Sequence, residues 1–200
     1  SGIEHQSLSR GYVITKPDQW FLTSVIDADL QVLPNVSNEI SRRGAYVVYF
    51  GTSEHYAKIR VLGSKPIAPG EIGNIRIFLN AKIPLVLGDR FILRESGRNQ
   101  TVGGGQILDP EPILKASKAN PDNSIERIIR ERGWITASHL EALTGVKRED
   151  TVPGWIVHPP LLQETIQTLQ NQINNAGPLG IEISGLNEQQ RAVISLLEGV

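Results

Sequence analysis

Alternating apolar and polar positions dominate the first half of the chain. In residues 56–62 the alternation predicts a strand with Ala57, Ile59 and Val61 on one face. Lys58 and Arg60 then lie on the opposite face. Similar short segments, bounded by turn residues, predict strands at residues 11–15, 21–33, 45–50, 72–79, 82–87, 91–94 and 105–108. No helical segment of about ten residues interrupts them, so an antiparallel barrel or sandwich is favoured over a parallel sheet.

The spacing of apolar positions changes after residues 109–112, Asp-Pro-Glu-Pro, and becomes helical. The clearest helix follows Pro159 and Pro160, which suit a first turn, and is expected to end at residues 174–178. Its apolar positions recur at intervals of three or four residues and define one face. These positions are Leu162, Ile166, Leu169 and Ile173.

Shorter elements precede and follow this helix. Asn123 is expected to cap a helix, with Glu126 as its capping-box partner. Thr136 or Ser138 should open a second short helix, residues 154–157 a strand, and residues 186–197 a final helix. This order is compatible with a winged-helix module.

Composition narrows the classes of function. The chain has 200 residues and a net charge of -1, which excludes a strongly basic nucleic-acid-binding protein but leaves room for a local basic patch. It has no cysteine, so disulfides, zinc fingers and cysteine nucleophiles are excluded. No apolar run approaches the roughly 20 residues of a membrane span, and no membrane partner is expected. The absence of methionine suggests a piece cut or processed from a longer protein.

The most unusual segment is residues 94–105, which runs from Arg94 to three consecutive glycines. Glycines allow another backbone to approach closely, and Arg98 and Thr101 beside them could bind a phosphate backbone. The alternative is a hairpin with a glycine bulge and no ligand, which the pattern alone favours. The segment is not a phosphate-binding P-loop, because it lacks the Gly-Lys-Ser/Thr ending and leads into a strand.

No other motif supports catalysis. His55 could titrate or bind a metal, but the other histidines lie in unrelated segments, so a solvated turn histidine is the preferred interpretation. No Gly-x-Ser-x-Gly elbow is present. We therefore expect no catalytic residue and no metal site in this chain.

Several segments resemble translation elongation factors. Residues 10–17, Arg-Gly-Tyr-Val-Ile-Thr-Lys-Pro, resemble the closing strand of the second domain of elongation factor Tu-type GTPases. Residues 88–94 with Gly97-Arg98 and Thr101-Val-Gly-Gly-Gly resemble the end of their third domain, with Asn99-Gln100 inserted. The continuation into Leu108-Asp109-Pro110, and Gly51-Thr52-x-Glu54, are similar to the selenocysteine-specific branch. Residues 154–159 extend a weaker resemblance into the helical part.

The resemblance implies a multi-domain β plus α protein. Residues 1–18 would be the final strand of a preceding barrel, residues 19–112 an elongation factor Tu-like antiparallel β-barrel, and residues 113–200 a winged-helix-like helical domain. It further implies delivery of selenocysteinyl-tRNA to the ribosome at recoded UGA codons in the cytoplasm. Later domains would bind an mRNA hairpin, and the helical domain here would link towards them.

The same resemblance assigns a candidate tRNA-binding loop to the barrel. Its residues would be Arg94, Arg98, Thr101, Gly103 and Gly104. GTP and Mg²⁺ would bind a GTPase domain that these residues do not contain, so no cofactor is expected here. The alternative is a structural module that only packs on neighbouring domains of a translation GTPase and does not contact RNA.

Overall fold

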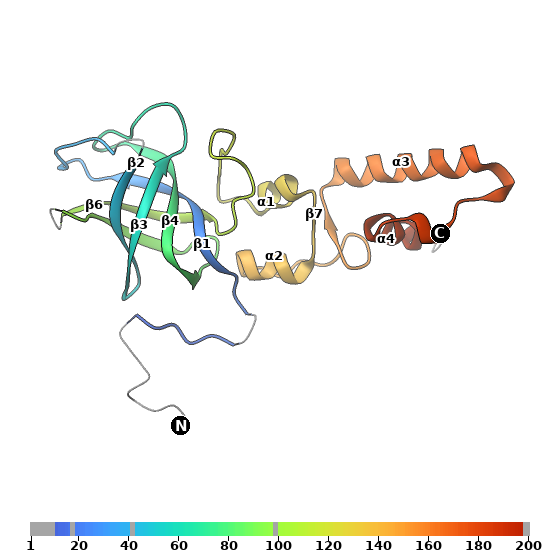
Figure 1. The fold of residues 1–200 in the computed structure, drawn as a ribbon, viewed down its shortest axis with the longest axis horizontal. Coiled ribbons are helices and arrows are strands. Elements are labelled where there is room, and N and C mark those ends of the chain that lie inside the picture. Colours follow the sequence, from blue (N-terminus) through green and yellow to red (C-terminus); the bar gives the residue numbers. More distant parts are fainter. Residues whose placement is uncertain (1–10, 17–18, 41–42, 98–99, 198–200) are drawn as a thin grey trace, which may run out of the picture. The chain divides into compact units, whose positions relative to one another are not determined.

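The structure of the chain is a computed structural model that describes residues 11–16, 19–40, 43–97 and 100–197. Within them the first part is a closed barrel, shown in Figure 1, with strand order β1-β4-β3-β2-β5-β6 and antiparallel pairing throughout. The strands are β1 (Leu22–Val32), β2 (Arg43–Phe50), β3 (Ser53–Val61), β4 (Ile72–Pro84), β5 (Arg90–Glu95) and β6 (Thr101–Asp109). The predicted barrel is confirmed.

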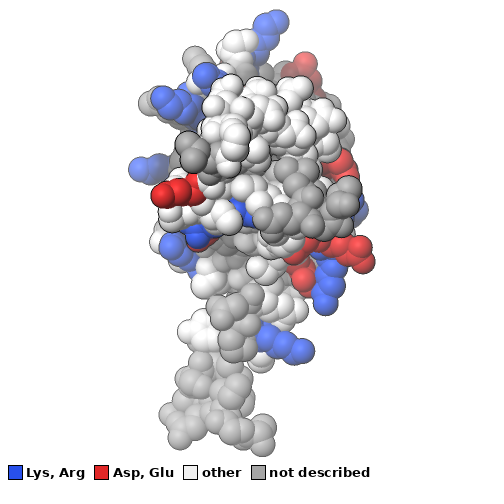
Figure 2. Space-filling view, turned by 90° about the vertical axis from the view of Figure 1, so that its right-hand side faces the viewer, with Lys and Arg blue, Asp and Glu red and all other residues white. Residues whose placement is uncertain are grey.

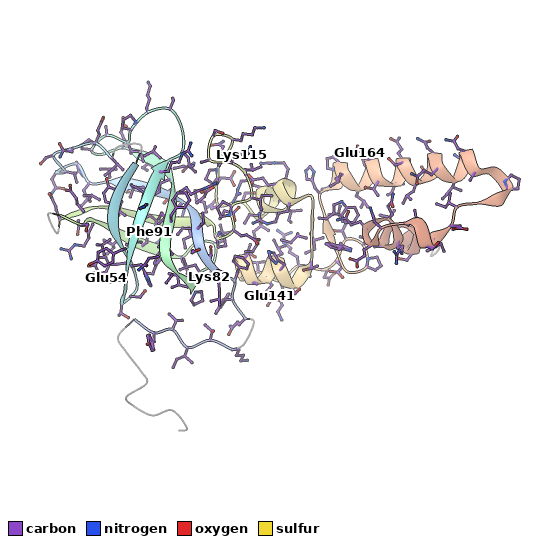
Figure 3. The ribbon with its side chains drawn as sticks, viewed as in Figure 1. Glu54, Lys82, Phe91, Lys115, Glu141 and Glu164 are labelled. Atoms are coloured by element: carbon purple, nitrogen blue, oxygen red, sulfur yellow. The ribbon has the colours of Figure 1, made fainter. Side chains whose placement is uncertain are left out.

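The core of the barrel follows from the alternation along its strands. Ala57, Ile59 and Val61 are buried inside, whereas Lys58 is exposed outside, as predicted. Equivalent positions on the other strands contribute Leu30, Ile77 and similar side chains, and Phe91 lies within the barrel (Figure 3). Because side chains alternate between faces, the residues between these positions form the outer face of the barrel.

One ion pair on the outer face is buried. The Arg76 guanidinium on β4 binds the Asp27 carboxylate on β1 with two hydrogen bonds, Nε to Oδ1 at 2.6 Å and an Nη to Oδ2 at 2.8 Å. The hydrogen bond to Asp27 raises the pKa of Arg76, against an opposing effect of burial. The alternation within residues 72–79 is consistent with an outward Arg76 but does not identify its partner.

Three strand predictions need correction. Residues 11–15 are not in a strand, because they form no strand pairing with any described residue. Residues 82–84 continue β4 rather than beginning a new strand, because Ile83 and Pro84 pair with β1. The last strand begins at Thr101 instead of residue 105, because Gly103 and Gly104 pair with both β1 and β5, and Gly105 pairs with β5.

The helical part contains two short strands and four α-helices among the described residues. They are α1 (Ile125–Arg132), β7 (Trp134–Ile135), α2 (Ala137–Thr144), β8 (Ile156–Val157), α3 (Pro159–Ala176) and α4 (Glu188–Leu197). Two 3₁₀ turns, η2 (Gly177–Leu179) and η3 (Ile183–Gly185), connect α3 to α4. β7 and β8 pair antiparallel. The winged-helix assignment stays a prediction.

The predicted start of α2 is confirmed, whereas α1 begins later than predicted. Thr136 caps α2, since its Oγ1 accepts a hydrogen bond from the His139 amide at 3.2 Å. α1 begins at Ile125, later than a cap at Asn123 would place it.

The predicted apolar face of α3 is only partly buried. Leu169 is fully buried beside Leu186 and Val193, with Leu162 and Ile166 packed at the edge of this cluster. Ile173 is 38% exposed, so the buried face ends before the last turn. α3 ends as expected, because Gly177 takes a positive φ of 59° there.

The chain divides into two compact units. One comprises Ser1–Ser124 with Ala142–Gly145, and the other Ile125–Glu141 with Val146–Val200. The division falls later than the expected boundary at residue 113, because the segment before α1 is held on the barrel. There the Asn74 side-chain amide on β4 donates to the Pro121 carbonyl at 3.0 Å.

Candidate nucleic-acid interface

The predicted site lies on the hairpin of β5 and β6. Arg94 on β5 pairs with Thr101 on β6, and the Glu95 amide donates to the Gln100 carbonyl at 2.9 Å to close the hairpin. Thr101 is exposed and Arg94 is half-buried. The structure therefore brings these two predicted residues together. Arg98 lies outside the described residues.

The glycines of the site are strand residues, which corrects the prediction of a loop. A Cβ on Gly103 would lie 2.4 Å from the Gln31 carbonyl oxygen, and one on Gly104 would lie 2.7 Å from the Phe91 carbonyl oxygen. On Gly105 it would lie 2.1 Å from the Asp29 carbonyl oxygen. The close approach of β1 and β5 thus requires glycine here, with or without a ligand. Gly103 is buried, whereas Gly104 is partly exposed.

Strand register places Arg94 in a row across the outer face. Arg94 pairs with Thr101 on one side and with Val47 of β2 on the other, and Val47 pairs with Tyr56 of β3. The Arg94 guanidinium carbon also lies 5.8 Å from the centre of the Tyr49 ring, within the range of a cation–π contact. A cation therefore sits among aromatic side chains on the outside of the barrel.

Tyr56 and Lys58 are members of this surface that the sequence did not single out as a site. Tyr56 is 63% exposed, and Lys58 follows two residues later on the same outward face of β3. The signal was present, because the alternation that put Lys58 outside also puts Tyr56 outside. What was missing was the order of strands, which brings β3 and β5 to either side of β2.

Overall charge does not favour an RNA site, because the chain has a net charge of -1. Figure 2 views the molecule from the side on which α3 and α4 lie in Figure 1, and on this face most of the residues that it colours are neither Lys, Arg, Asp nor Glu. At the hairpin, burial first and the Glu95 carboxylate second raise the pKa of Tyr46, so this phenol stays uncharged at neutral pH. An RNA site at the hairpin would depend on individual residues rather than on overall charge.

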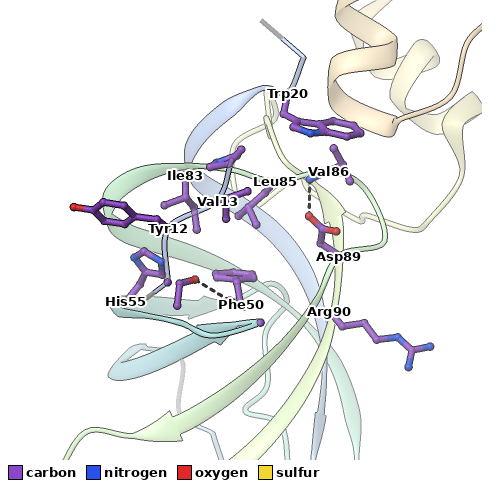
Figure 4. A pocket seen from close by; sticks show the side chains of 14 residues that line it. Tyr12, Val13, Trp20, Phe50, His55, Ile83, Leu85, Val86, Asp89 and Arg90 are labelled. Carbon is purple, nitrogen blue, oxygen red and sulfur yellow. Dashed lines mark hydrogen bonds between the residues drawn. The ribbon is translucent and has the colours of Figure 1, made fainter. Parts of the chain in front are cut away.

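His55 lies in a pocket and not in a solvated turn, which corrects its prediction. It belongs to β3 and pairs with Val48, and its Nε2 atom is buried without a hydrogen-bond partner among the described residues. Burial lowers the pKa of His55. The pocket, about 580 Å³ in volume, is walled mainly by apolar side chains such as Phe50, Leu85 and Trp20 (Figure 4).

Two further features bear on the class of protein. Over the described ranges, no three His, Cys, Asp or Glu side chains are grouped so that they could hold a metal ion. None of the described helices is both long enough and apolar enough to cross a membrane.

The barrel is similar to a known family of domains. The family model of the selenocysteine-specific elongation factor β-barrel domain matches residues 27–113, which include every residue of the predicted site. The selenocysteine-specific elongation factor of Desulfomicrobium baculatum is 32% identical over a 182-residue alignment that covers 84% of this chain and 27% of that protein. The chain thus spans about a quarter of the length of this relative.

A solved structure has the same fold. The crystal structure of a bacterial selenocysteine-specific elongation factor, EF-Sec, matches with a TM-score of 0.61 at 16% identity, over 98% of this chain and 36% of that one. With the closed six-stranded barrel and the family match together, residues 27–113 of this chain form a β-barrel domain of the selenocysteine-specific elongation factor type.

Proposed function

We propose that this chain is the part of a selenocysteine-specific elongation factor that holds the backbone of the delivered tRNA against its barrel. The factor would bring selenocysteinyl-tRNA to the ribosome at recoded UGA codons in the cytoplasm. GTP and Mg²⁺ would be bound by another part of that factor. The helical unit, proposed to be winged-helix-like, would link the barrel towards modules that bind the mRNA hairpin.

The observation that carries this proposal is the family match over residues 27–113 together with the outward row on β6, β5, β2 and β3. Arg94 supplies a guanidinium that can grip a phosphate with two donors, and the exposed Thr101 hydroxyl can add a third. Lys58 supplies a second positive charge on the same outer face. RNA helices are recognised through such phosphate and 2′-hydroxyl contacts.

The alternative is a structural hairpin without RNA contact. The close contacts of Gly103, Gly104 and Gly105 favour this interpretation for the glycines, because packing alone accounts for them. They do not account for the choice of Arg94 and Thr101, because the approach of the strands requires neither side chain, although Arg94 also contacts the Tyr49 ring. The tRNA role is therefore proposed for these two residues, with Arg98 as a further member, and Gly103 and Gly104 are proposed to let the strands close beneath them.

The test is binding of the 200-residue chain to selenocysteine tRNA and to an elongator tRNA over a series of KCl concentrations. We expect tighter binding to selenocysteine tRNA and an affinity that falls as salt rises, because phosphate contacts release counterions. A folded chain that binds neither tRNA at low salt would contradict the proposal and favour the structural alternative.

A further inference from the structure

A groove on the outer face of the barrel lies beside the proposed tRNA row. One line of paired residues crosses β1, β6, β5 and β2 there, and its members are Gln31, Gly104, Ile92 and Tyr49. Adjacent strands are about 4.8 Å apart, so Gln31 and Ile92 stand on either side of a position that has no side chain. The result is a hollow of about 710 Å³, within the range of roughly 300–1,000 Å³ typical of small-ligand sites.

The walls of this groove combine three kinds of chemistry. Ile92 is 51% exposed and, with Tyr49, offers apolar and aromatic surface. Gln31 and Gln106 offer side-chain amides, which can donate and accept hydrogen bonds. Arg90 is exposed at the same groove and provides a positive charge.

The acidic member of the groove is already engaged. The Asp29 carboxylate accepts a hydrogen bond from the backbone amide nitrogen of Gln106 at 2.7 Å. Its charge is therefore directed at the β6 backbone, whereas Arg90 is exposed at the surface. A ligand with a negative group beside a flat apolar group fits this distribution.

Two other classes of ligand fit less well. An extended peptide would need an unpaired strand edge, but Gly104 pairs with β1 on one side and with β5 on the other. A regular duplex keeps its bases stacked and paired, so Tyr49, Ile92 and the two glutamines would find no partner. An unpaired nucleotide presents a base face for stacking, a base edge for amides and a phosphate for Arg90.

We propose that this groove binds an unpaired nucleotide of the RNA whose backbone lies on the neighbouring Arg94 row. The inference rests on the proposed function, because it assigns a second contact to the same RNA. The base stacks against Tyr49 and Ile92, the amide of Gln31 or Gln106 binds its edge, and Arg90 holds its phosphate.

The test uses the full chain and a short fluorescein-labelled oligouridylate, with binding followed by fluorescence anisotropy. Stacking of one base is worth about 1–3 kcal/mol, so Tyr49→Leu should weaken binding roughly five- to hundredfold. Phe78→Leu is the matched control, because Phe78 is also an exposed aromatic on the outer face but lies on β4, away from the groove. Arg90→Gln, at an exposed position, should weaken binding and reduce its salt dependence.

The outcomes separate this inference from the proposed function. The groove site is supported if oligouridylate binds, if a blunt RNA duplex competes poorly for it, and if only Tyr49→Leu and Arg90→Gln lower the affinity. If the chain binds selenocysteine tRNA but not oligouridylate, or if Phe78→Leu and Tyr49→Leu behave alike, the groove site is wrong and the proposed function stands. If no tRNA binds, the proposed function fails, and the groove loses its stated ligand. Melting temperatures of all variants check that each is folded.

Discussion

At the scale of single residues, the glycines have the clearest physical role. They are needed where β6 approaches its neighbours too closely for a Cβ atom. The sequence favoured a glycine bulge without a ligand at Gly103, Gly104 and Gly105, but it left a ligand open as the alternative. Consecutive glycines in the sequence indicate that another backbone comes close to them. The pairing of β6 with both β1 and β5 shows that this backbone is the protein's own and not a ligand's.

A substitution at Gly105 tests this role. Gly105→Ala should destabilise the chain by about 1–3 kcal/mol, because its Cβ would overlap the Asp29 carbonyl oxygen. Gly97→Ala is the control, since a Cβ there would meet no atom of the described part of the chain within 4 Å. Urea unfolding measures both. Equal stability of the two variants would show that β6 can move away from β1 at little cost.

The buried ion pair gives a second prediction at this scale. Asp27→Ala should cost about 3–5 kcal/mol in urea unfolding, because the buried Arg76 guanidinium would lose its carboxylate. The double variant Asp27→Leu with Arg76→Met should recover much of that loss, because it removes both charges. A single variant as stable as the unsubstituted chain would mean that water reaches Arg76 readily.

His55 predicts a dependence of stability on pH. Burial lowers its pKa from the usual 6.5, so the unfolded chain binds a proton at a higher pH than the folded chain does. The contribution of neutral His55 is therefore complete above about pH 6.5 and is lost as the pH falls through the folded pKa. We expect the urea midpoint to fall on acidification, and to fall less in His55→Gln. An identical pH profile in that variant would contradict the assignment.

At the scale of elements, strands were predicted well where alternation meets a single core, as in β3. The predictions failed at residues 11–15, where β-prone residues have no pairing partner among the described residues, and at residues 82–84, which continue β4. Strand propensity is a local property, whereas pairing depends on the rest of the chain. The exposed last turn of α3 has the same cause, because apolar spacing continues to Ile173 although the packed cluster does not.

The graded burial along α3 can be measured. Leu169→Ala should cost about 2–5 kcal/mol, because Leu169 is 0% exposed within its cluster. Ile173→Ala, four residues later on the same face, should cost less than about 1 kcal/mol because the side chain is already partly solvated. The two variants are compared by denaturant unfolding, which is followed by the circular dichroism signal of the helices. Similar losses would mean that the last turn of α3 is buried in solution.

At the scale of the whole molecule, the barrel and the helical part were both predictable from the change of period near residues 109–112. The candidate site was predictable only in its Arg94–Thr101 part. Tyr56 and Tyr49 join Arg94 only through the strand order β3-β2-β5, and sequence distance gave no sign of it. Fold class follows from repeated local patterns, whereas a surface that spans four strands follows from their order.

The most direct test of the account is the salt dependence of tRNA binding in Arg94→Gln. Removing one phosphate contact should weaken binding and lower the slope of log affinity against log salt by roughly one. Lys115→Gln removes the same charge from an exposed position outside the barrel strands and should leave the slope unchanged. If Arg94→Gln melts like the unsubstituted chain and binds selenocysteine tRNA with the same affinity and slope, the barrel does not hold the tRNA backbone through this row.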